Sequence, residues 1–401
     1  MTNLQTEPSY RKLLAAAGFA WLFDAMDVGM LSFVVAALAK EWQLTSAQVG
    51  LIGSISSLGM AVGAVALGAL ADRFQRQNIL ISSLLIFSIF NGLSALAGSY
   101  IVFIGLRFIV GIGLGGELPV ASTLVSEKAP ATIRGRTVVL LESFWAGGWL
   151  LSALISYFLI PQFGWRVAVA MTSLTAVYAI VLRIHLKGTT SQVPQQRLSL
   201  TTRLRTIWSG TYFSATLMLW TVWFMVVFSY YGMFLWLPSV MVLRGYSIVE
   251  SFGYVLLMTL AQLPGYFTAA WAIERWGRKL TLVVFLTGTA FSAILFGLAQ
   301  SLVMLMIFGV LLSFFNLGAW GALYAYSPEQ YPAEVRGTGT GLAAGFGRIG
   351  GIVGPLLVGL LLQAHVAITI IFGIFFAAIL IAIAAILILG KETMAAQNPA
   401  A

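Results

Sequence analysis

The chain has 401 residues, of which 60% are hydrophobic and only 9% are charged, with a formal net charge of +9. A mean hydropathy of +0.95 excludes a soluble protein, because such a chain could not cover its apolar surface with polar groups. The lack of cysteine excludes a disulfide framework and thiolate chemistry. The composition therefore predicts a polytopic membrane protein. Its first apolar stretch is long and contains Asp24 and Asp27, which is not the pattern of a cleaved signal peptide.

Hydropathy predicts twelve membrane spans, each long enough to cross a hydrocarbon layer of roughly 30 Å. They cover residues about 13–38, 49–71, 79–97, 101–124, 137–159, 165–186, 211–237, 250–272, 280–298, 302–326, 338–362 and 366–389. One long polar interruption follows the sixth span. It predicts an N-terminal six-helix bundle over 1–187, a cytoplasmic linker over 188–210 and a C-terminal six-helix bundle over 211–401.

The positive charges set the expected orientation. With the N-terminus in the cytoplasm, only three of the 22 Lys and Arg residues lie on the outer side of the membrane, namely Lys40, Arg166 and Arg244. Two more, Arg107 and Arg348, lie within spans. This asymmetry follows the positive-inside rule and places both termini on the cytoplasmic side of the cell (inner) membrane. It also explains the positive net charge without a nucleic-acid partner. The other seventeen of the 22 Lys and Arg residues are on the cytoplasmic side: Arg11, Lys12, Arg73, Arg76, Lys128, Arg134, Arg136, Arg183, Lys187, Arg197, Arg203, Arg205, Arg275, Arg278, Lys279, Arg336 and Lys391.

Loop residues repeat at one constant offset (274 − 72 = 202). Because the same offset occurs in two separate loops, it predicts a duplicated bundle whose halves have the same orientation. The matching residues are Asp72-Arg73 with Glu274-Arg275, Glu127 with Glu329, Pro130 with Pro332, and Arg134-Gly135 with Arg336-Gly337.

These loops resemble those of a known transporter family. Gly68-x-x-x-Asp72-Arg73-x-x-Arg76 resembles the signature loop of the major facilitator superfamily, and Pro328-Glu329-x-x-Pro332-x-x-x-Arg336-Gly337 resembles a motif of its sugar-porter and organic-ion branches. The likeness covers the whole chain and departs at Gln75 and Ala270, where glycine is expected. It implies the all-α major facilitator fold of twelve transmembrane helices in two pseudo-symmetric six-helix halves, and secondary active transport by alternating access.

We interpret the loop charges as a cytoplasmic gate. Asp72 would lie at the positive N-terminal end of the span near Gly337, while Arg73 and Arg134 engage Glu127. The alternative is a set of solvated charges that only follow the positive-inside rule. The expected gating residues are Asp72, Arg73, Arg76, Glu127, Arg134, Glu274, Arg275, Glu329 and Arg336.

Arg348 is the single charge in the predicted span over 338–362, ten residues from its start. A guanidinium stays protonated and is costly in lipid, so it must face a water-filled cavity, an acidic partner or an anionic ligand. Neighbouring glycines, including Gly347 and Gly350, let a helix or a ligand approach the backbone closely.

Acidic residues within the first span predict a second functional site. Asp24 and Asp27 share one helical face, and Arg107 on the fourth span lies at a depth that its side chain can bridge to Asp27. We expect Asp27 and Arg107 to form a pair that opens so that the carboxylate takes a proton, with Asp24 beside it. The alternative is a permanent ion pair that only holds the two spans together.

Aromatic and amide side chains in the second half predict a binding site for a flat ligand. Tyr230 and Tyr231 precede Gly232, where the helix can bend, and Pro238 is expected to end this span. Each aromatic taken singly fits packing or lipid contact equally well, and the amides can cross-link helices instead. The substrate-binding candidates are Arg348, Tyr230, Tyr231, Asn316, Trp320 and Tyr324, with Trp21, which recurs at the repeat offset as Trp223, and Gln262.

No catalytic motif supports an enzyme. Two G-x-G-x-x-G strings, at Gly111–Gly116 and Gly345–Gly350, lie inside spans without a preceding strand, so they fail the test for a dinucleotide fold. Metalloprotease, serine-hydrolase and phosphate-binding signatures are lacking. We therefore expect no enzymatic activity, no cofactor and no metal.

Two functional classes remain, a secondary transporter and an inert receptor or scaffold, and only the first explains charges within spans. GFGRIGGIVGP around Arg348 resembles the mammalian organic anion transporters, in which an arginine there favours anions. With LFDAMDVGMLSF, GGELPVASTLVSEKAP and FSYYGMFLWLPS, the chain resembles bacterial niacin permeases. The resemblance implies nicotinate as the substrate, whereas the residues alone indicate an aromatic anion. We expect import together with a proton, by a monomer in the lipid bilayer. The alternatives are a proton symporter for another aromatic acid, and a sugar or organic-cation porter.

Overall fold

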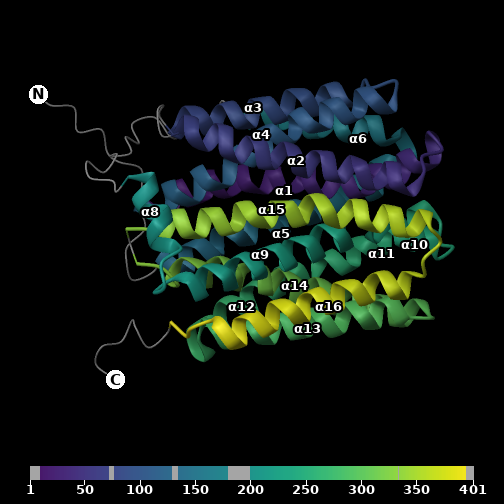
Figure 1. The fold of residues 1–401 in the computed structure, drawn as a ribbon. Helices are drawn as coiled ribbons and strands as arrows, with labels where there is room; N and C mark the ends of the chain where they lie inside the picture. The colour runs from purple at the N-terminus through teal and green to yellow at the C-terminus, as the bar shows by residue number, and fades with distance from the viewer. Residues whose placement is uncertain (1–9, 72–75, 129–133, 179–198, 333, 394–401) are drawn as a thin grey trace, which may run out of the picture. The chain divides into compact units, whose positions relative to one another are not determined.

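The computed structural model describes residues 10–71, 76–128, 134–178, 199–332 and 334–393. Within these ranges it does not describe the side chains of residues 10–13, 68, 69, 71, 76, 77, 116–128, 134–136, 138, 139 and 200. The elements of the described ranges are all helices (Figure 1): α1 (Tyr10–Glu41), α2 (Ser46–Ala71), α3 (Arg76–Ser94), α4 (Tyr100–Lys128), α5 (Arg134–Phe163), α6 (Trp165–Thr172), η2 (Ser173–Thr175), α8 (Leu200–Ile207), α9 (Phe213–Phe234), α10 (Leu237–Leu243), α11 (Ile248–Leu260), α12 (Gln262–Trp276), α13 (Arg278–Leu298), α14 (Leu302–Glu329), α15 (Arg336–Gln363) and α16 (Ile368–Leu389).

These helices confirm the predicted all-helical membrane architecture. In the described part of the chain, nine helical stretches are long and apolar enough to cross a membrane, with α11 and α12 counted as one, and two shorter apolar helices cover 78–94 and 100–115. Together they account for every predicted span except the sixth. That span begins at residue 165 as expected, with α6 and η2, and its residues from 179 on are outside the described ranges.

Two prolines make the helix boundaries differ from those expected. The eighth span is two helices, α11 and α12, which meet at Ala261, because Pro264 has no N–H to donate to the carbonyl of Leu260. The expectation that Pro238 ends the seventh span is wrong. Helix α9 already ends at Phe234, and Pro238 is at the start of α10, where its missing N–H costs nothing.

Part of the predicted linker is also helical. Helix α8 covers Leu200–Ile207, and the hydroxyl of Ser199 caps it by accepting a hydrogen bond from the backbone N–H of Thr202 at 3.1 Å. The rest of the linker up to residue 198 is outside the described ranges.

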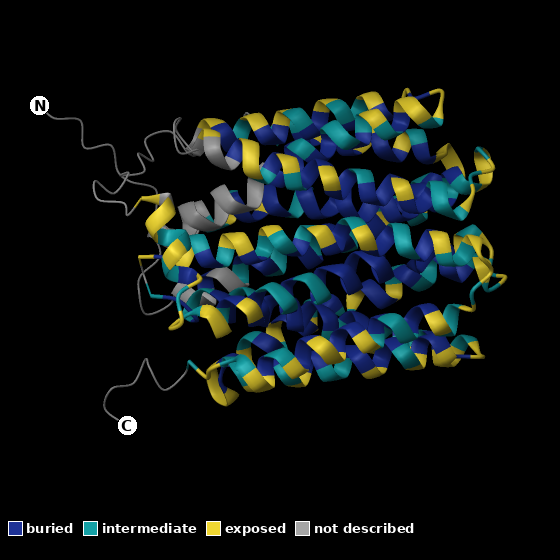
Figure 2. Cartoon of the chain, in the orientation of Figure 1, coloured by how far each residue is buried: buried dark blue, intermediate teal, exposed yellow. Residues whose placement is uncertain are grey.

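The surface of the helices is apolar, as lipid contact requires. Large aliphatic side chains such as Val65, Leu96 and Ile388 are 75%, 80% and 78% exposed. Exposed and buried positions alternate along the outer helices α13 and α16 (Figure 2), while polar side chains such as Asn91 and Gln262 are fully buried. This distribution is the reverse of that in a soluble protein.

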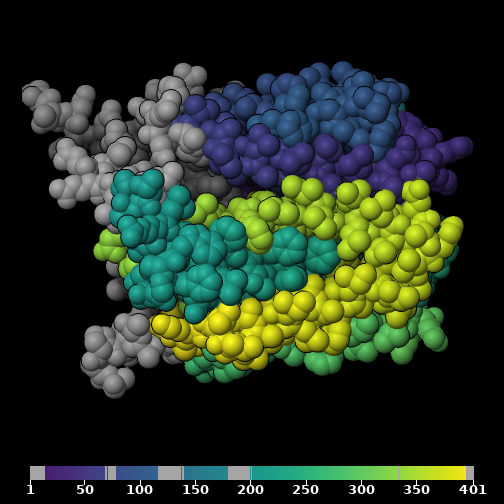
Figure 3. Space-filling model, in the orientation of Figure 1, coloured from purple at the N-terminus to yellow at the C-terminus, as the bar shows by residue number. Residues whose placement is uncertain are grey.

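The chain forms two compact units. Unit 1 comprises Met1–Met30 and Ile55–Gln195, and unit 2 comprises Leu31–Ser54 and Gln196–Ala401. In unit 2, α9 lies between α15 and α16 (Figure 3), and α13 packs on both α14 and α16. The start of α2 also belongs to unit 2, where Ser54 donates a hydrogen bond to the carbonyl of Ile352 at 2.6 Å. The division at a linker over 188–210 stays a prediction.

One close helix contact made by a glycine occurs at matching positions in both halves. A Cβ on Gly63 would lie 2.0 Å from the carbonyl oxygen of Ile112, and a Cβ on Gly265 would lie 2.3 Å from that of Phe314. Both glycines therefore allow backbone approaches that a larger residue would block. The offset is that of the loop motifs (265 − 63 = 202 and 314 − 112 = 202).

A second pair of contacts has the same offset. A Cβ on Gly148 would lie 2.2 Å from the carbonyl oxygen of Leu22, and one on Gly350 would lie 2.5 Å from that of Phe224 (350 − 148 = 202 and 224 − 22 = 202). The two halves thus use the same packing points, which confirms that the bundle is duplicated.

Candidate functional site

Arg348 lies at the contact between α15 and α9. It is half-buried, and its Nη1 donates a hydrogen bond to the hydroxyl oxygen of Tyr231 at 3.1 Å. Helix α9 can come this close because Gly347 has no side chain, and a Cβ there would lie 3.0 Å from the carbonyl oxygen of Trp223. The guanidinium keeps its charge, so the arrangement supplies a fixed cation beside a phenol.

Aromatic rings continue from this cation. The Tyr230 ring lies 5.2 Å from the Tyr231 ring and 4.9 Å from the Trp320 ring, and Trp320 lies 6.0 Å from Tyr324, all between ring centroids. We call Arg348, Tyr231, Tyr230, Trp320 and Tyr324 the Arg348 cluster. The structure therefore brings together five of the candidates proposed for one aromatic anion.

Trp223 also packs on this cluster and was missed as a site residue. Its ring centroid lies 4.9 Å from that of Tyr324, and its indole Nε1 donates to the hydroxyl of Ser327 at 3.0 Å. The available signal was its position seven residues before Tyr230, on the same face of α9.

Two amide side chains complete the candidates in unit 2. Asn316 is buried one helical turn before Trp320, and Gln262 is fully buried at the start of α12. Trp21 belongs to unit 1 instead, where its ring centroid lies 4.7 Å from that of Trp145. A role of Trp21 in substrate binding stays a prediction.

The Asp27–Arg107 contact is present in unit 1. Nη2 of Arg107 donates to Oδ2 of Asp27 at 2.6 Å, and Nη1 donates to Oδ1 at 3.4 Å. Nη1 also donates to Oδ1 of Asn91 at 2.7 Å, and Asn91 in turn donates to Thr172 at 2.6 Å. With Asp27 and Arg107 only 1% and 2% exposed, their charges depend on each other for stabilisation.

Asp24 is buried on α1, one turn from Asp27. On α5, Glu142 is fully buried as well. The role of Asp24 stays a prediction, as does proton transfer at Asp27.

Comparison with known proteins identifies the family. A sequence profile described as Major Facilitator Superfamily matches residues 17–265 and 252–401. The chain belongs to the major facilitator superfamily. Its helices are accordingly those of a multi-pass membrane transporter.

Relatives within the superfamily include transporters of small molecules. A candidate niacin/nicotinamide transporter, NiaP, of Bacillus subtilis is 59% identical over 387 residues, covering 96% of this chain and 97% of the relative. The niacin transporter NiaP of Acinetobacter baylyi is 46% identical, covering 98% and 96%. A gentisate transporter of Corynebacterium glutamicum is 32% identical, covering 87% and 81%.

A solved structure of a superfamily member supports the fold alone. The xylose transporter XylE from E. coli, in a partially occluded inward open conformation, superposes with a TM-score of 0.77 at 17% identity. The match covers 96% of this chain and 98% of that chain.

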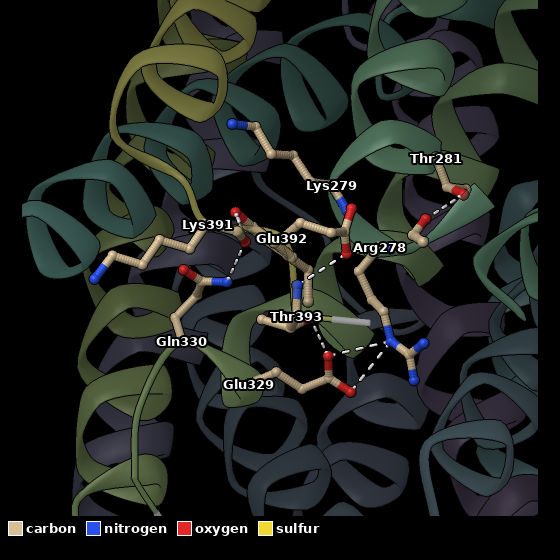
Figure 4. Close-up of polar contacts among 10 residues, drawn as sticks. Arg278, Lys279, Thr281, Glu329, Gln330, Lys391, Glu392 and Thr393 are labelled. Carbon is tan, nitrogen blue, oxygen red and sulfur yellow. Dashed lines mark hydrogen bonds and ion pairs between the residues drawn. The ribbon is translucent and has the colours of Figure 1, made fainter. Parts of the chain in front are cut away.

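At one end of unit 2, Glu329 of the loop motif forms a polar cluster with Arg278, Glu392 and Thr393, which we call the Glu329 cluster (Figure 4). Nε of Arg278 lies 3.1 Å from Oε2 of Glu329, which also accepts a hydrogen bond from the hydroxyl of Thr393. The carboxylate of Glu392 accepts hydrogen bonds from the backbone N–H groups of Arg278 and Lys279 at 3.0 and 3.1 Å. The segment after α16 thereby caps the start of α13.

The other expected gating residues are distributed differently. Glu274 and Arg275 are exposed, and the guanidinium of Arg275 lies 5.0 Å from the Trp271 ring centroid. Arg336 is exposed, and its Nε donates to the carbonyl of Tyr331 at 3.4 Å. Outside the described residues or side chains are Asp72, Arg73, Arg76, Glu127 and Arg134.

Tyr331 joins this loop to α9. It is buried, and it shares a hydrogen bond of 2.9 Å with the hydroxyl of Thr216. Burial raises the pKa of the Tyr331 phenol, an effect that this hydrogen bond opposes. The phenol therefore stays neutral throughout the physiological range.

Proposed function

We propose that this transporter imports a small aromatic carboxylate, most specifically nicotinate, across the cell membrane. The observation that carries the proposal is the half-buried Arg348 guanidinium, held at 3.1 Å from the Tyr231 hydroxyl at the edge of a group of aromatic rings. A guanidinium binds a carboxylate through two parallel hydrogen bonds, and aromatic rings bind the face of a flat ligand.

The names of two relatives fit this chemistry. The transporter from Acinetobacter baylyi is named for niacin and that from Bacillus subtilis for niacin/nicotinamide, and both cover nearly the whole chain. A second candidate, another aromatic acid, is favoured by the gentisate transporter, because gentisate is also an aromatic carboxylate. Both substrates would place their carboxylate at Arg348.

We propose that the Asp27–Arg107 pair couples transport to a proton. In the paired form Arg107 stabilises the carboxylate, and when the pair opens the buried carboxyl group gains a proton. The pair would alternate between these forms as the two halves rock about a midplane site, with both termini in the cytoplasm and the chain acting as a monomer.

The gate would lie among the loop charges. We propose that Glu329 and Arg278, at the end of unit 2, act with the matching residues of the first half, Glu127 and Arg76 (329 − 127 = 202 and 278 − 76 = 202). Breaking and forming such pairs would accompany the change between inward and outward access.

Uptake of labelled nicotinate into proteoliposomes with an imposed pH gradient tests this function. Wild-type uptake should increase when the outside is more acidic. Asp27→Asn should bind nicotinate and lose the response to the gradient. A receptor or scaffold would give no uptake under either condition, and uptake that ignores the gradient would remove the proton role.

A further inference from the structure

Several buried side chains in unit 2 have polar atoms without hydrogen-bond partners in the described structure. Among these atoms are both side-chain polar atoms of Gln262, the hydroxyl of Ser313 and Oδ1 of Asn316. Leaving a buried donor or acceptor unsatisfied is unfavourable, and nearly all such groups in native proteins have a partner. Their retention in an otherwise apolar bundle points to a polar ligand.

Helix contacts place Gln262 on α12 at about the level of Ser313 on α14. Gly309 on α14 packs against Met258 on α11, and Gly265 on α12 packs against Phe314 on α14. The separations (309 − 258 = 51 and 314 − 265 = 49) show that α14 runs in the same direction as α11 and α12. Since 262 + 51 = 313, Gln262 lies at about the level of Ser313.

Gln262 faces the interior of the bundle. It shares the buried side of α12 with Gly265 and Tyr266, and the opposite side, with Pro264 and Phe267, is exposed. Because Gly265 contacts α14 and lies three residues after Gln262, the amide is on the α14 side of its helix.

The depth of Gln262 matches that of the Arg348 cluster. Arg348 is 12 residues from the start of α15 (348 − 336). Asn316 is 13 residues from the end of α14 (329 − 316), and Gln262 is 14 residues from the end of α12 (276 − 262). These three ends are joined by short loops and by the Arg278–Glu329 pair. The three side chains are therefore about 18 to 21 Å from the same end of unit 2, within one helical turn of one another.

We propose that Gln262 recognises the ring nitrogen of a pyridine carboxylate, with its Nε2 group donating the hydrogen bond. This inference rests on the proposed function, in which Arg348 binds the carboxylate and Tyr230 and Trp320 contact the ring. A neutral pyridine nitrogen only accepts hydrogen bonds, so its partner must be a donor. Gln262 supplies such a donor, since its buried Nε2 group has no hydrogen-bond partner in the described structure.

The proposal makes Gln262 a specificity residue that distinguishes nicotinate from benzoate. The two acids share the carboxylate and the ring, and benzoate lacks the nitrogen. Benzoate would leave the buried amide without a partner, so we expect wild-type protein to bind nicotinate roughly 10- to 100-fold more tightly.

Binding of both acids to purified Gln262→Met tests the role. The fold should accept methionine, because Met60 occupies the matching position of the first half (262 − 202 = 60) and is buried there. The variant should lose affinity for nicotinate and keep that for benzoate, so that the ratio approaches one. The matched control is Thr259→Val, since the buried Thr259 hydroxyl already donates to Val255 at 2.8 Å, and its ratio should stay at the wild-type value.

The outcomes separate this inference from the proposed function. Equal wild-type affinities for the two acids, which need no variant to measure, would overturn the role of Gln262 and leave Arg348 as the carboxylate site. Equal losses for both acids in Gln262→Met would overturn it as well. Failure of wild-type protein to bind either acid would instead remove the proposed function and this inference together.

Discussion

Ser229 on α9 occupies the position that Asp27 occupies on α1 in the duplicated bundle (229 − 27 = 202). Arg107 and the amide that it contacts are replaced too, since Arg107 corresponds to Gly309 and Asn91 to Ala293. The second half folds without these charges, so the bundle does not require them. Their presence in the first half is better explained by function than by packing.

The converse holds for the Arg348 cluster. Tyr230, Tyr231 and Arg348 match small or apolar, buried positions of the first half, and Gln262 and Asn316 do the same. Each half thus carries one polar site that the other lacks. The matches are Tyr230 with Val28, Tyr231 with Gly29, Gln262 with Met60, Asn316 with Leu114 and Arg348 with Ala146.

Breaking the buried ion pair from one side should destabilise the protein. Arg107→Met leaves the Asp27 carboxylate buried without its cation, which typically costs about 3–5 kcal/mol. The double variant Asp27→Asn with Arg107→Met should recover most of this loss, because no buried charge remains. Thermal unfolding in detergent measures both, and a double variant no more stable than Arg107→Met would contradict the prediction.

Removing one phenol oxygen should weaken binding without unfolding the protein. Tyr231→Phe keeps the ring but removes the acceptor that orients Arg348, and a hydrogen bond to a charged group contributes about 1.5–3 kcal/mol. We expect nicotinate affinity to fall by roughly tenfold or more in a binding titration. Tyr254→Phe, in the ring pair with Tyr246, serves as the control and should bind as wild type does. Similar losses in the two variants would exclude a specific role for the Tyr231 hydroxyl.

The glycines of α15 should differ sharply in their tolerance of alanine. A Cβ on Gly350 would lie 2.5 Å from the carbonyl oxygen of Phe224, so Gly350→Ala must push α9 and α15 apart. Overpacking of this kind costs about 1–3 kcal/mol. Gly345→Ala on the same helix meets no atom within 4 Å and should be neutral or slightly stabilising. Equal melting temperatures would show that the close contact does not stabilise the bundle.

The carboxylate that caps α13 should contribute to stability at the Glu329 cluster. Glu392→Gln keeps the shape of the side chain and removes the charge that faces the backbone N–H groups of Arg278 and Lys279. Loss of a cap costs about 0.5–2 kcal/mol. The exposed Glu334, in the loop after α14, provides the control Glu334→Gln. Faster amide exchange at the start of α13 in the first variant alone is the expected result, and unchanged exchange there would be evidence against the cap.

Much of the fold followed from the sequence because lipid imposes strong patterns. The spans follow from long apolar stretches, and the Asp27–Arg107 contact follows from residue depth at 1.5 Å per residue. Asn316, Trp320 and Tyr324 form a stripe at i, i+4 and i+8, and the structure places the two aromatic members beside each other. These features depend on helical geometry alone, which sequence spacing specifies.

Features that depend on tertiary contacts were not predictable in the same way. Asn91 cross-links helices, but sequence spacing does not indicate its partners, Arg107, whose Nη1 donates to its Oδ1 at 2.7 Å, and Thr172. Glu392 lies far in sequence from the helix that it caps, and nothing local indicates that contact. The break at Ala261 had a local signal in Pro264, which hydropathy averages away.

Binding of nicotinate and nicotinamide to wild-type protein and to Arg348→Ala tests the central claim most directly. The two ligands share the pyridine ring and differ in the carboxylate that Arg348 is expected to bind, and Ala146 at the matching position of the first half indicates that alanine fits. Wild-type protein should bind nicotinate at least tenfold more tightly than nicotinamide, and Arg348→Ala should lose that preference. Equal wild-type affinities, or unchanged nicotinate binding in Arg348→Ala, would contradict the account.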